Sequence, residues 1–142
     1  MKQLAALALL LLAFGCATGY QSLDEGITGG YTETRLAPDE WRLLVEGNGL
    51  TERRQVEQIL LRRAAELTLE QGKRYFVLDE HRAWVRARRD GYRAPADQAI
   101  VTALFEREPR AFDAIDIVNQ TNEIARGRLS PAAQATLQRL TS

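Results

Sequence analysis

Arginine side chains gather in one short segment of the chain. Between positions 82 and 93 the acidic residue is Asp90 alone, and Trp84 and Tyr92 lie among the arginines. A guanidinium fork matches the geometry of phosphate, and Trp favours boundaries between water and apolar matter. This pattern predicts an anion-binding surface, with a solvent-exposed β-hairpin whose arginines balance acidic neighbours as the alternative. The arginines concerned are Arg82, Arg86, Arg88, Arg89 and Arg93.

Residues for catalysis or metal binding are sparse. His81 is the single histidine, and a metal site usually needs two or more His or Cys ligands, so we expect no metal and no cofactor. After residues 1–15 the serines are Ser22, Ser130 and Ser142, and none has a histidine placed to activate it as a hydrolase would require. We therefore predict that the protein is not an enzyme.

Three smaller groups each have a structural and a functional interpretation. Asp79 and Glu80 are adjacent carboxylates, which point to opposite faces of a strand unless one lies in a bulge. Asp113 and Asp116 would share a helix face, as a weak cation site or as a solvated surface. The sequence Gly-Asn-Gly at 47–49, just before a predicted helix, is either an anion cradle or a tight connection that needs positive φ angles.

The N-terminus carries the signature of export. Lys2 precedes an apolar run from Leu4 to Phe14, whose 11 residues would span roughly 16 Å as a helix, about half of a bilayer core. Residues 1–15 therefore have the features of a secretory signal. The sequence Ala-Phe-Gly-Cys at 13–16 resembles the lipobox of bacterial lipoproteins. That resemblance implies cleavage between Gly15 and Cys16, with a diacylglyceryl group and an N-acyl chain on Cys16.

The predicted lipid fits the rest of the chain. Cys16 is the single cysteine, so no intramolecular disulfide can form. Two or more acyl chains give stable anchoring. The residue after Cys16 is Ala17 and not Asp. In Gram-negative lipoproteins, which this segment resembles, the lack of Asp at that position favours sorting to the outer membrane, facing the periplasm. In the periplasm, the phosphates that the arginine segment could bind would be those of lipid headgroups or lipopolysaccharide.

Charge argues against nucleic acid as a partner. The chain has 19 basic and 19 acidic residues, and removing Lys2 with the signal leaves a net charge of −1. Residues 16–30 are rich in Gly and polar residues and predict a flexible tether, with a reach of roughly 20 Å. Residues 31–142 are the length of one domain.

The domain shows alternating strand and helix patterns. We predict an antiparallel pair of strands at 31–36 and 41–46, a helix at 52–71 with Thr51 as its N-cap and Gly72 as its end, and strands at 75–82 and 98–106. The helix carries Arg54, Gln58, Arg62 and Glu66 opposite its apolar face. Short helices follow at 112–118 and, capped by Ser130, at 132–140. The fold class is α+β, with an antiparallel sheet of four or five strands packed on the long helix.

Several phrases together resemble a family of small Gram-negative lipoproteins of unknown function. They are GGYTET at 29–34, GNG and Thr51 at 47–51, RAAELTLE at 63–70, and Gly72 with YF at 75–76. The resemblance covers roughly residues 12–78, and residues 83–97 depart from it. It implies no known activity. We therefore expect a membrane-anchored periplasmic protein, non-enzymatic and structural or accessory, with an envelope protein as a partner. The alternative is a polyanion- or small-ligand-binding lipoprotein that uses the segment from Arg82 to Arg93.

Overall fold

The computed structural model describes residues 30–87, 89, 91–126 and 128–142. The predicted signal peptide, the cleavage site at Gly15 and Cys16, the tether up to residue 29, and Arg88 lie outside the described residues. The expectations about them stay predictions.

The centre of the domain is one five-stranded antiparallel sheet. Its strands lie in the order β1-β2-β4-β3-β5, so β4 separates β2 from β3. The predicted α+β fold is confirmed, including the antiparallel pairing of β1 with β2. The strands are β1 (Gly30–Ala37), β2 (Glu40–Glu46), β3 (Tyr75–Ala87), β4 (Arg93–Leu104) and β5 (Phe112–Asp113).

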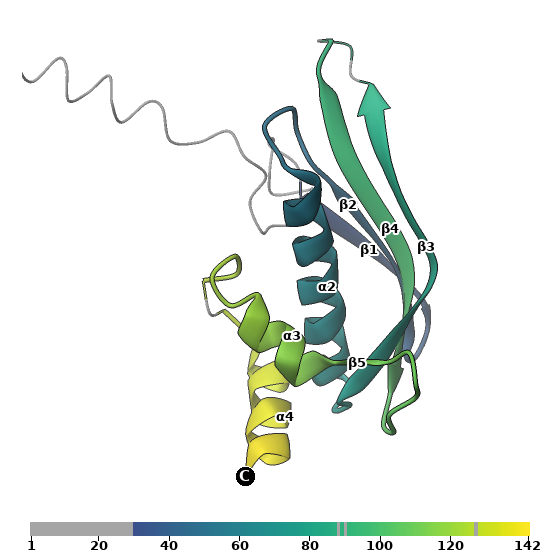
Figure 1. The fold of residues 1–142 in the computed structure, drawn as a ribbon. Coiled ribbons are helices and arrows are strands. Elements are labelled where there is room, and N and C mark those ends of the chain that lie inside the picture. Colours follow the sequence, from purple (N-terminus) through teal and green to yellow (C-terminus); the bar gives the residue numbers. More distant parts are fainter. Residues whose placement is uncertain (1–29, 88, 90, 127) are drawn as a thin grey trace, which may run out of the picture.

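The helices form two further layers on one side of the sheet (Figure 1). Helix α2 (Arg53–Glu70) lies directly on the sheet, and α3 (Ala114–Gln120) and α4 (Pro131–Thr141) pack on the side of α2 away from the sheet. Among the described residues, no helix is both long and apolar enough to cross a membrane.

The main core lies between α2 and the sheet. Alternate residues of β2 and β4 point toward the helix, as the period of a strand requires. From the helix side, Val56, Ile59 and Leu60 fill the same layer. The strand residues buried there include Leu43, Val45, Ala99 and Val101.

Two predicted helix boundaries are confirmed by their local geometry. Gly72 follows α2 with a φ angle of +75°, which suits glycine. The Ser130 hydroxyl accepts a hydrogen bond from the backbone N–H of Ala133, and Pro131 opens α4.

The predicted N-cap of α2 is wrong. Glu52 is the N-cap residue and makes no side-chain capping bond. The Thr51 hydroxyl instead accepts from the backbone N–H of Asn48 and donates to its side-chain oxygen, both at 2.9 Å. Thr51 therefore closes the preceding loop, and a Cβ atom on Gly47 would lie 2.8 Å from that of Thr51.

Strands β3 and β4 differ in length from the prediction. They pair as a long hairpin from Tyr75 opposite Leu104 to Ala87 opposite Arg93, so β3 runs past its predicted end at 82 and β4 begins before its predicted start at 98. Phe105 lies beyond β4 and is 72% exposed. The added residues of the two strands pair with each other beside the hairpin turn, and the pattern of neither segment alone indicates this ladder.

Phe112 does not begin a helix as predicted. It lies in β5, where its ring stacks on Phe76 with 5.2 Å between the ring centroids. Asp113 is the N-cap of α3, and its carboxylate accepts from the backbone N–H of Ile115 at 3.0 Å.

The polar face predicted for α2 is also only partly correct. Arg54 is exposed, but Arg62 and Glu66 are buried. The reason is the layer formed by α3 and α4, which covers the side of α2 that would otherwise face water.

Candidate functional site

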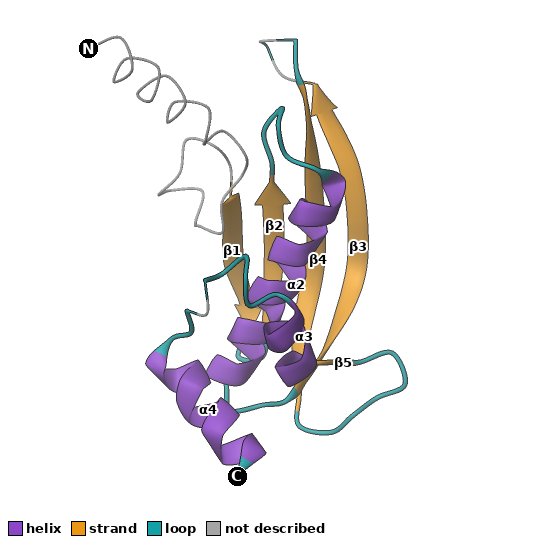
Figure 2. Ribbon diagram, turned by 60° about the vertical axis from the view of Figure 1, so that its left-hand side comes forward, coloured by secondary structure: helices purple, strands orange, loops and turns teal. Residues whose placement is uncertain are grey.

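The arginine segment forms the β3–β4 hairpin, which extends beyond the start of α2 (Figure 2). Arg82 and Arg86 lie in β3, and Arg93 is the first residue of β4. Arg89 lies in the connecting turn and is exposed, as are the other three. The hairpin predicted as the alternative interpretation is therefore present, and the arginines are spread along it rather than gathered at one point.

One face of the sheet carries two of these arginines, and we call it the open face. It comprises the side chains of β2, β3 and β4 that point away from α2, and no described helix covers it (Figure 1). The strand register aligns Leu44 with Gln98 and Gln98 with Arg82 across this face. Other members include Arg42, Glu46, Trp84, Arg86, Ala94, Ala96, Ile100 and Thr102.

Arg86 is engaged within the protein. It forms an ion pair with Glu46, which reaches across β4 from β2. Ala94 and Ala96 lie on the strand between these two partners and are buried. Small residues on β4 thus allow the two long side chains to meet, and the sheet itself balances the charge of Arg86.

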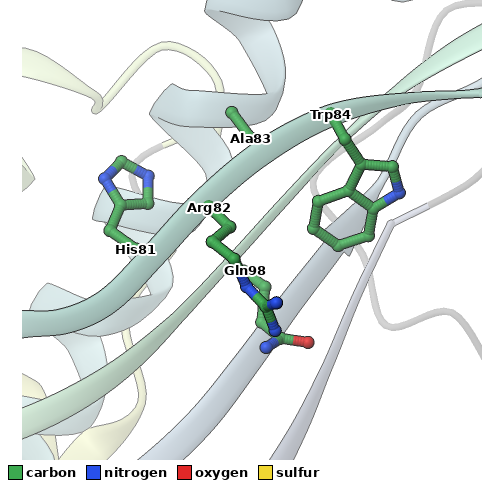
Figure 3. A pocket seen from close by; sticks show the side chains of 5 residues that line it. All are labelled: His81, Arg82, Ala83, Trp84 and Gln98. Carbon is green, nitrogen blue, oxygen red and sulfur yellow. The ribbon is translucent and has the colours of Figure 1, made fainter.

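A hollow of about 630 Å³ lies beside the middle of β3 and is lined by five side chains. In Figure 3, Arg82 and Gln98 lie on one side of the β3 ribbon, and His81 and Ala83 lie on the other. The lining therefore draws on both faces of β3 and, through Gln98, on the neighbouring β4. Of the five predicted arginines, it contains only Arg82. The lining residues are His81, Arg82, Ala83, Trp84 and Gln98.

The outer edge of β3 is exposed over much of its length. Strand β5 pairs only with Tyr75 and Phe76, and no other described strand pairs with this edge. A bulge interrupts β3 where the register shifts between Asp79 and Arg82, and Glu80 there has a φ angle of 49°. Bulges and charged side chains protect sheet edges from pairing with other chains. The bulge and the exposed charge of Arg82 are therefore features of a sheet edge that is protected from pairing.

His81 contacts a buried carboxylate. Its Nε2 atom lies 2.7 Å from Oδ1 of Asp97, which is 3% exposed. Burial raises the pKa of Asp97, and the neighbouring His81 lowers it part of the way back. A histidine oriented by a carboxylate is part of a general-base arrangement, but the side chains that line this hollow include no hydroxyl or thiol nucleophile.

Two of the remaining acidic candidates, Asp79 and Asp113, have partners inside the protein. Asp79 forms an ion pair of 2.8 Å with Arg110. Asp113 caps α3 and also pairs with Arg74 at 2.8 Å, a contact that raises the pKa of Arg74. In the described part of the chain, no three His, Cys, Asp or Glu side chains gather in a way that could hold a metal ion.

The loop at 47–51 is a tight connection. Thr51 and Asn48 bond to each other, and the Asn48 carboxamide oxygen also accepts from the backbone N–H of Leu50 at 2.9 Å. The N–H of Gly47 donates to the carbonyl of Pro95 at 2.8 Å. Because these donors are used internally, this loop is a tight connection rather than an anion cradle. The predicted need for positive φ angles is wrong, since Gly47 and Gly49 lack them; a Cβ atom on either would instead lie within 3.0 Å of a neighbouring side chain.

The strongest polar cluster is one that the sequence patterns did not indicate. Arg62 is fully buried and donates to Glu66, to the carbonyl of Val118 and to the carbonyl of Arg128, each at 2.9 Å. Seven of the residues from 59 to 69 are apolar, but Arg62, Arg63 and Glu66 share the remaining side of the helix, so its own pattern does not indicate that this side is covered.

Arg63 extends this cluster toward the sheet. Its guanidinium group pairs with Glu33 of β1 at 2.6 Å, with Glu66 at 3.1 Å and with Glu70 at 3.3 Å. Burial lowers the pKa of Arg63, but the carboxylates of Glu33 and Glu70 outweigh that effect and raise it. Ser130 also donates to Glu70, at 3.1 Å. The cluster thus joins β1, α2, α3 and the start of α4, which is a structural role.

Comparisons with known proteins give no match to this chain, whether with protein-family models, with curated proteins or with solved structures.

Proposed function

We propose that the protein is a lipid-anchored, non-enzymatic accessory component of the cell envelope that binds a protein partner on its open face. The anchor rests on the lipobox resemblance at residues 13–16. The partner rests on one observation, which is a broad sheet surface that the described helices leave uncovered.

The chemistry of the open face supports a protein partner. Leu44 and Ile100 are partly exposed near its centre, and Trp84 is 39% exposed on the β3 side of the same face. Arg42 and Arg82 are exposed on either side of β4. Trp and Arg are the residues most often found among the energetic centres of interfaces, and a polar rim round apolar residues is typical of them.

Photo-crosslinking in intact cells tests the partner. A photoreactive amino acid would replace Leu44 or Ile100, and a control would carry it at Gln138, which is exposed on α4. We expect the two open-face positions to yield the same crosslinked protein, identified by mass spectrometry, and the control to yield none of it. Equal crosslinking from all three positions would contradict the proposal.

Signal processing tests the anchor separately. Globomycin, which inhibits the lipoprotein signal peptidase, should cause an uncleaved precursor to accumulate. The variant Cys16→Ser should leave the membrane fraction. Unaffected processing, or membrane retention of the variant, would contradict a lipid at Cys16.

The hollow beside β3 favours a second candidate function, the binding of a small anion. Arg82 and Gln98 supply hydrogen-bond donors there, and Trp84 supplies a flat apolar wall. Titration with inorganic phosphate or inositol hexakisphosphate should change the fluorescence of Trp84. The change should disappear in Arg82→Ser and persist in Arg107→Ser, a matched loss of one exposed arginine away from the hollow.

A further inference from the structure

The point at which the chain enters the domain defines one end of the molecule. Gly30 begins β1 and pairs with Glu46, the last residue of β2. Glu46 in turn pairs with Ala96, and Ala96 with Trp84 in the far half of the hairpin. The start of β1, the loop at 47–52, the start of α2 and the turn of the β3–β4 hairpin therefore lie toward the same end (Figure 2). We call this the anchor end.

The proposed lipid is close to this end along the chain. Thirteen residues, 17–29, separate Cys16 from Gly30. The tether predicted for these residues has a root-mean-square reach of roughly 20 Å. With Cys16 in the bilayer, the anchor end is the part of the described domain that lies nearest to the lipid headgroups.

Apolar side chains are exposed at the anchor end. Leu50 is 65% exposed, Tyr92 is 63% exposed and Val85 is 49% exposed. The two loops touch, because a Cβ atom on Gly49 would lie 3.0 Å from that of Tyr92. Val85 pairs with Pro95, whose carbonyl binds the Gly47 N–H. The three side chains therefore belong to adjoining segments, and exposed apolar groups of this kind mark contact surfaces.

Positive charge accompanies these apolar groups. Arg53 and Arg54 are exposed at the start of α2, and Arg89 and Arg93 are exposed at the hairpin turn. The exposed acidic residues in the first turns of α2 are Glu52 and Glu57. At the opposite end, the loop after β4 carries exposed charges of both signs in equal number: Glu106, Arg107, Glu108 and Arg110.

We propose that the anchor end lies on the surface of an anionic bilayer. Leu50 and Tyr92 would enter the headgroup region, where amphipathic rings are favoured, and Arg53, Arg54 and Arg93 would pair with lipid phosphates. This inference rests on the lipid anchor of the proposed function but not on the protein partner. It also orients the domain, because the open face then stands beside the bilayer rather than on it.

Depth measurements on the mature lipidated chain test this proposal. Cys16 is the only native cysteine, so an introduced cysteine is the single thiol that remains free once Cys16 is lipidated. Leu50→Cys would carry a nitroxide spin label. Phe105→Cys is the matched control, because Phe105 is also an exposed apolar residue but lies at the opposite end of the domain, just after β4, where the neighbouring charges are balanced. The chains would be reconstituted into vesicles of phosphatidylethanolamine and phosphatidylglycerol.

The expected result is a loss of accessibility to a water-soluble relaxation agent, with a gain in accessibility to oxygen, at position 50 and not at position 105. Arg53→Glu combined with Arg54→Glu should restore the water accessibility of the label at position 50, and Arg107→Glu should not. Equal water accessibility at positions 50 and 105 in chains that float with the vesicles overturns this inference alone. Chains that do not float overturn the lipid anchor and this inference together.

Discussion

Replacing Arg62 with methionine tests the interpretation of the buried cluster as the joint between the helical layers. Methionine keeps most of the apolar stem but removes three hydrogen bonds of 2.9 Å, to Glu66 and to the carbonyls of Val118 and Arg128. Glu66 is 5% exposed, so its charge would stay buried with one fewer partner. The two carbonyls would lose donors that come from a different layer of the fold.

The magnitude follows from the burial of these groups. Removing one partner of a buried ion pair costs about 3–5 kcal/mol, and leaving a buried polar group unpaired costs about 1–3 kcal/mol. These costs overlap, because Arg63 still contacts Glu66 at 3.1 Å. We therefore expect Arg62→Met to lower the free energy of unfolding by about 4 kcal/mol, a large part of the total of roughly 5–15 kcal/mol that is typical of a domain.

Urea unfolding followed by circular dichroism measures this change, on the chain without residues 1–16. Arg54→Met is the matched control, because Arg54 is exposed on the same helix, and we expect it to change stability by less than about 0.5 kcal/mol. The double variant Arg62→Met with Glu66→Leu should recover part of the loss, since it removes the unpaired charge. A loss below about 1 kcal/mol for Arg62→Met would refute the reasoning.

Three further predictions concern single sites. Burial raises the pKa of Asp97 above its unfolded value of about 4. The stability of the wild type relative to Asp97→Asn should therefore be greatest below about pH 4 and should fall as the pH rises through the raised pKa. Urea unfolding at several pH values measures this difference, and a rise with pH would contradict the prediction. Gly72→Ala should lower the free energy of unfolding by about 1 kcal/mol, because the φ angle of +75° strains a residue that has a side chain. The space around Gly72 is open, so no steric clash adds to this strain, and a lower melting temperature would report it. Ser130→Ala should lower the free energy of unfolding by about 1–2 kcal/mol through loss of the cap of α4 and of the bond to Glu70, measured in the same urea titration.

The features that depend on a few neighbouring residues, such as the inward face of a strand and the ends of helices, could be predicted from the sequence. Trp41, Leu43 and Val45 occupy every second position of β2 and point to α2, as strand periodicity requires. Gly72 and Ser130 mark helix ends because their chemistry acts over a few residues. The burial of Arg62 depends on α3 and α4, which begin more than 50 residues later, so no window centred on α2 contains its cause.

The candidate site shows the same limit. The sequence indicated a hairpin with exposed arginines, but it did not indicate that Arg86 would meet Glu46, because these residues are 40 positions apart and belong to strands that β4 separates. The order β1-β2-β4-β3-β5 makes this contact possible by placing Ala94 and Ala96 between the partners. Charge counts along a segment therefore overstate the positive charge that the folded surface presents.

The two proposed contact surfaces are compatible because they lie on different parts of one sheet. The strands run from the anchor end to the opposite end, and β4 alone, with 12 residues, is roughly 35 Å long. The open face is parallel to that direction, whereas the loops with Leu50 and Tyr92 cap its end. If the anchor end rests on a bilayer, a partner on the open face would approach along the membrane plane. Crosslinks from Leu44 should then persist when Arg53 and Arg54 are reversed in charge.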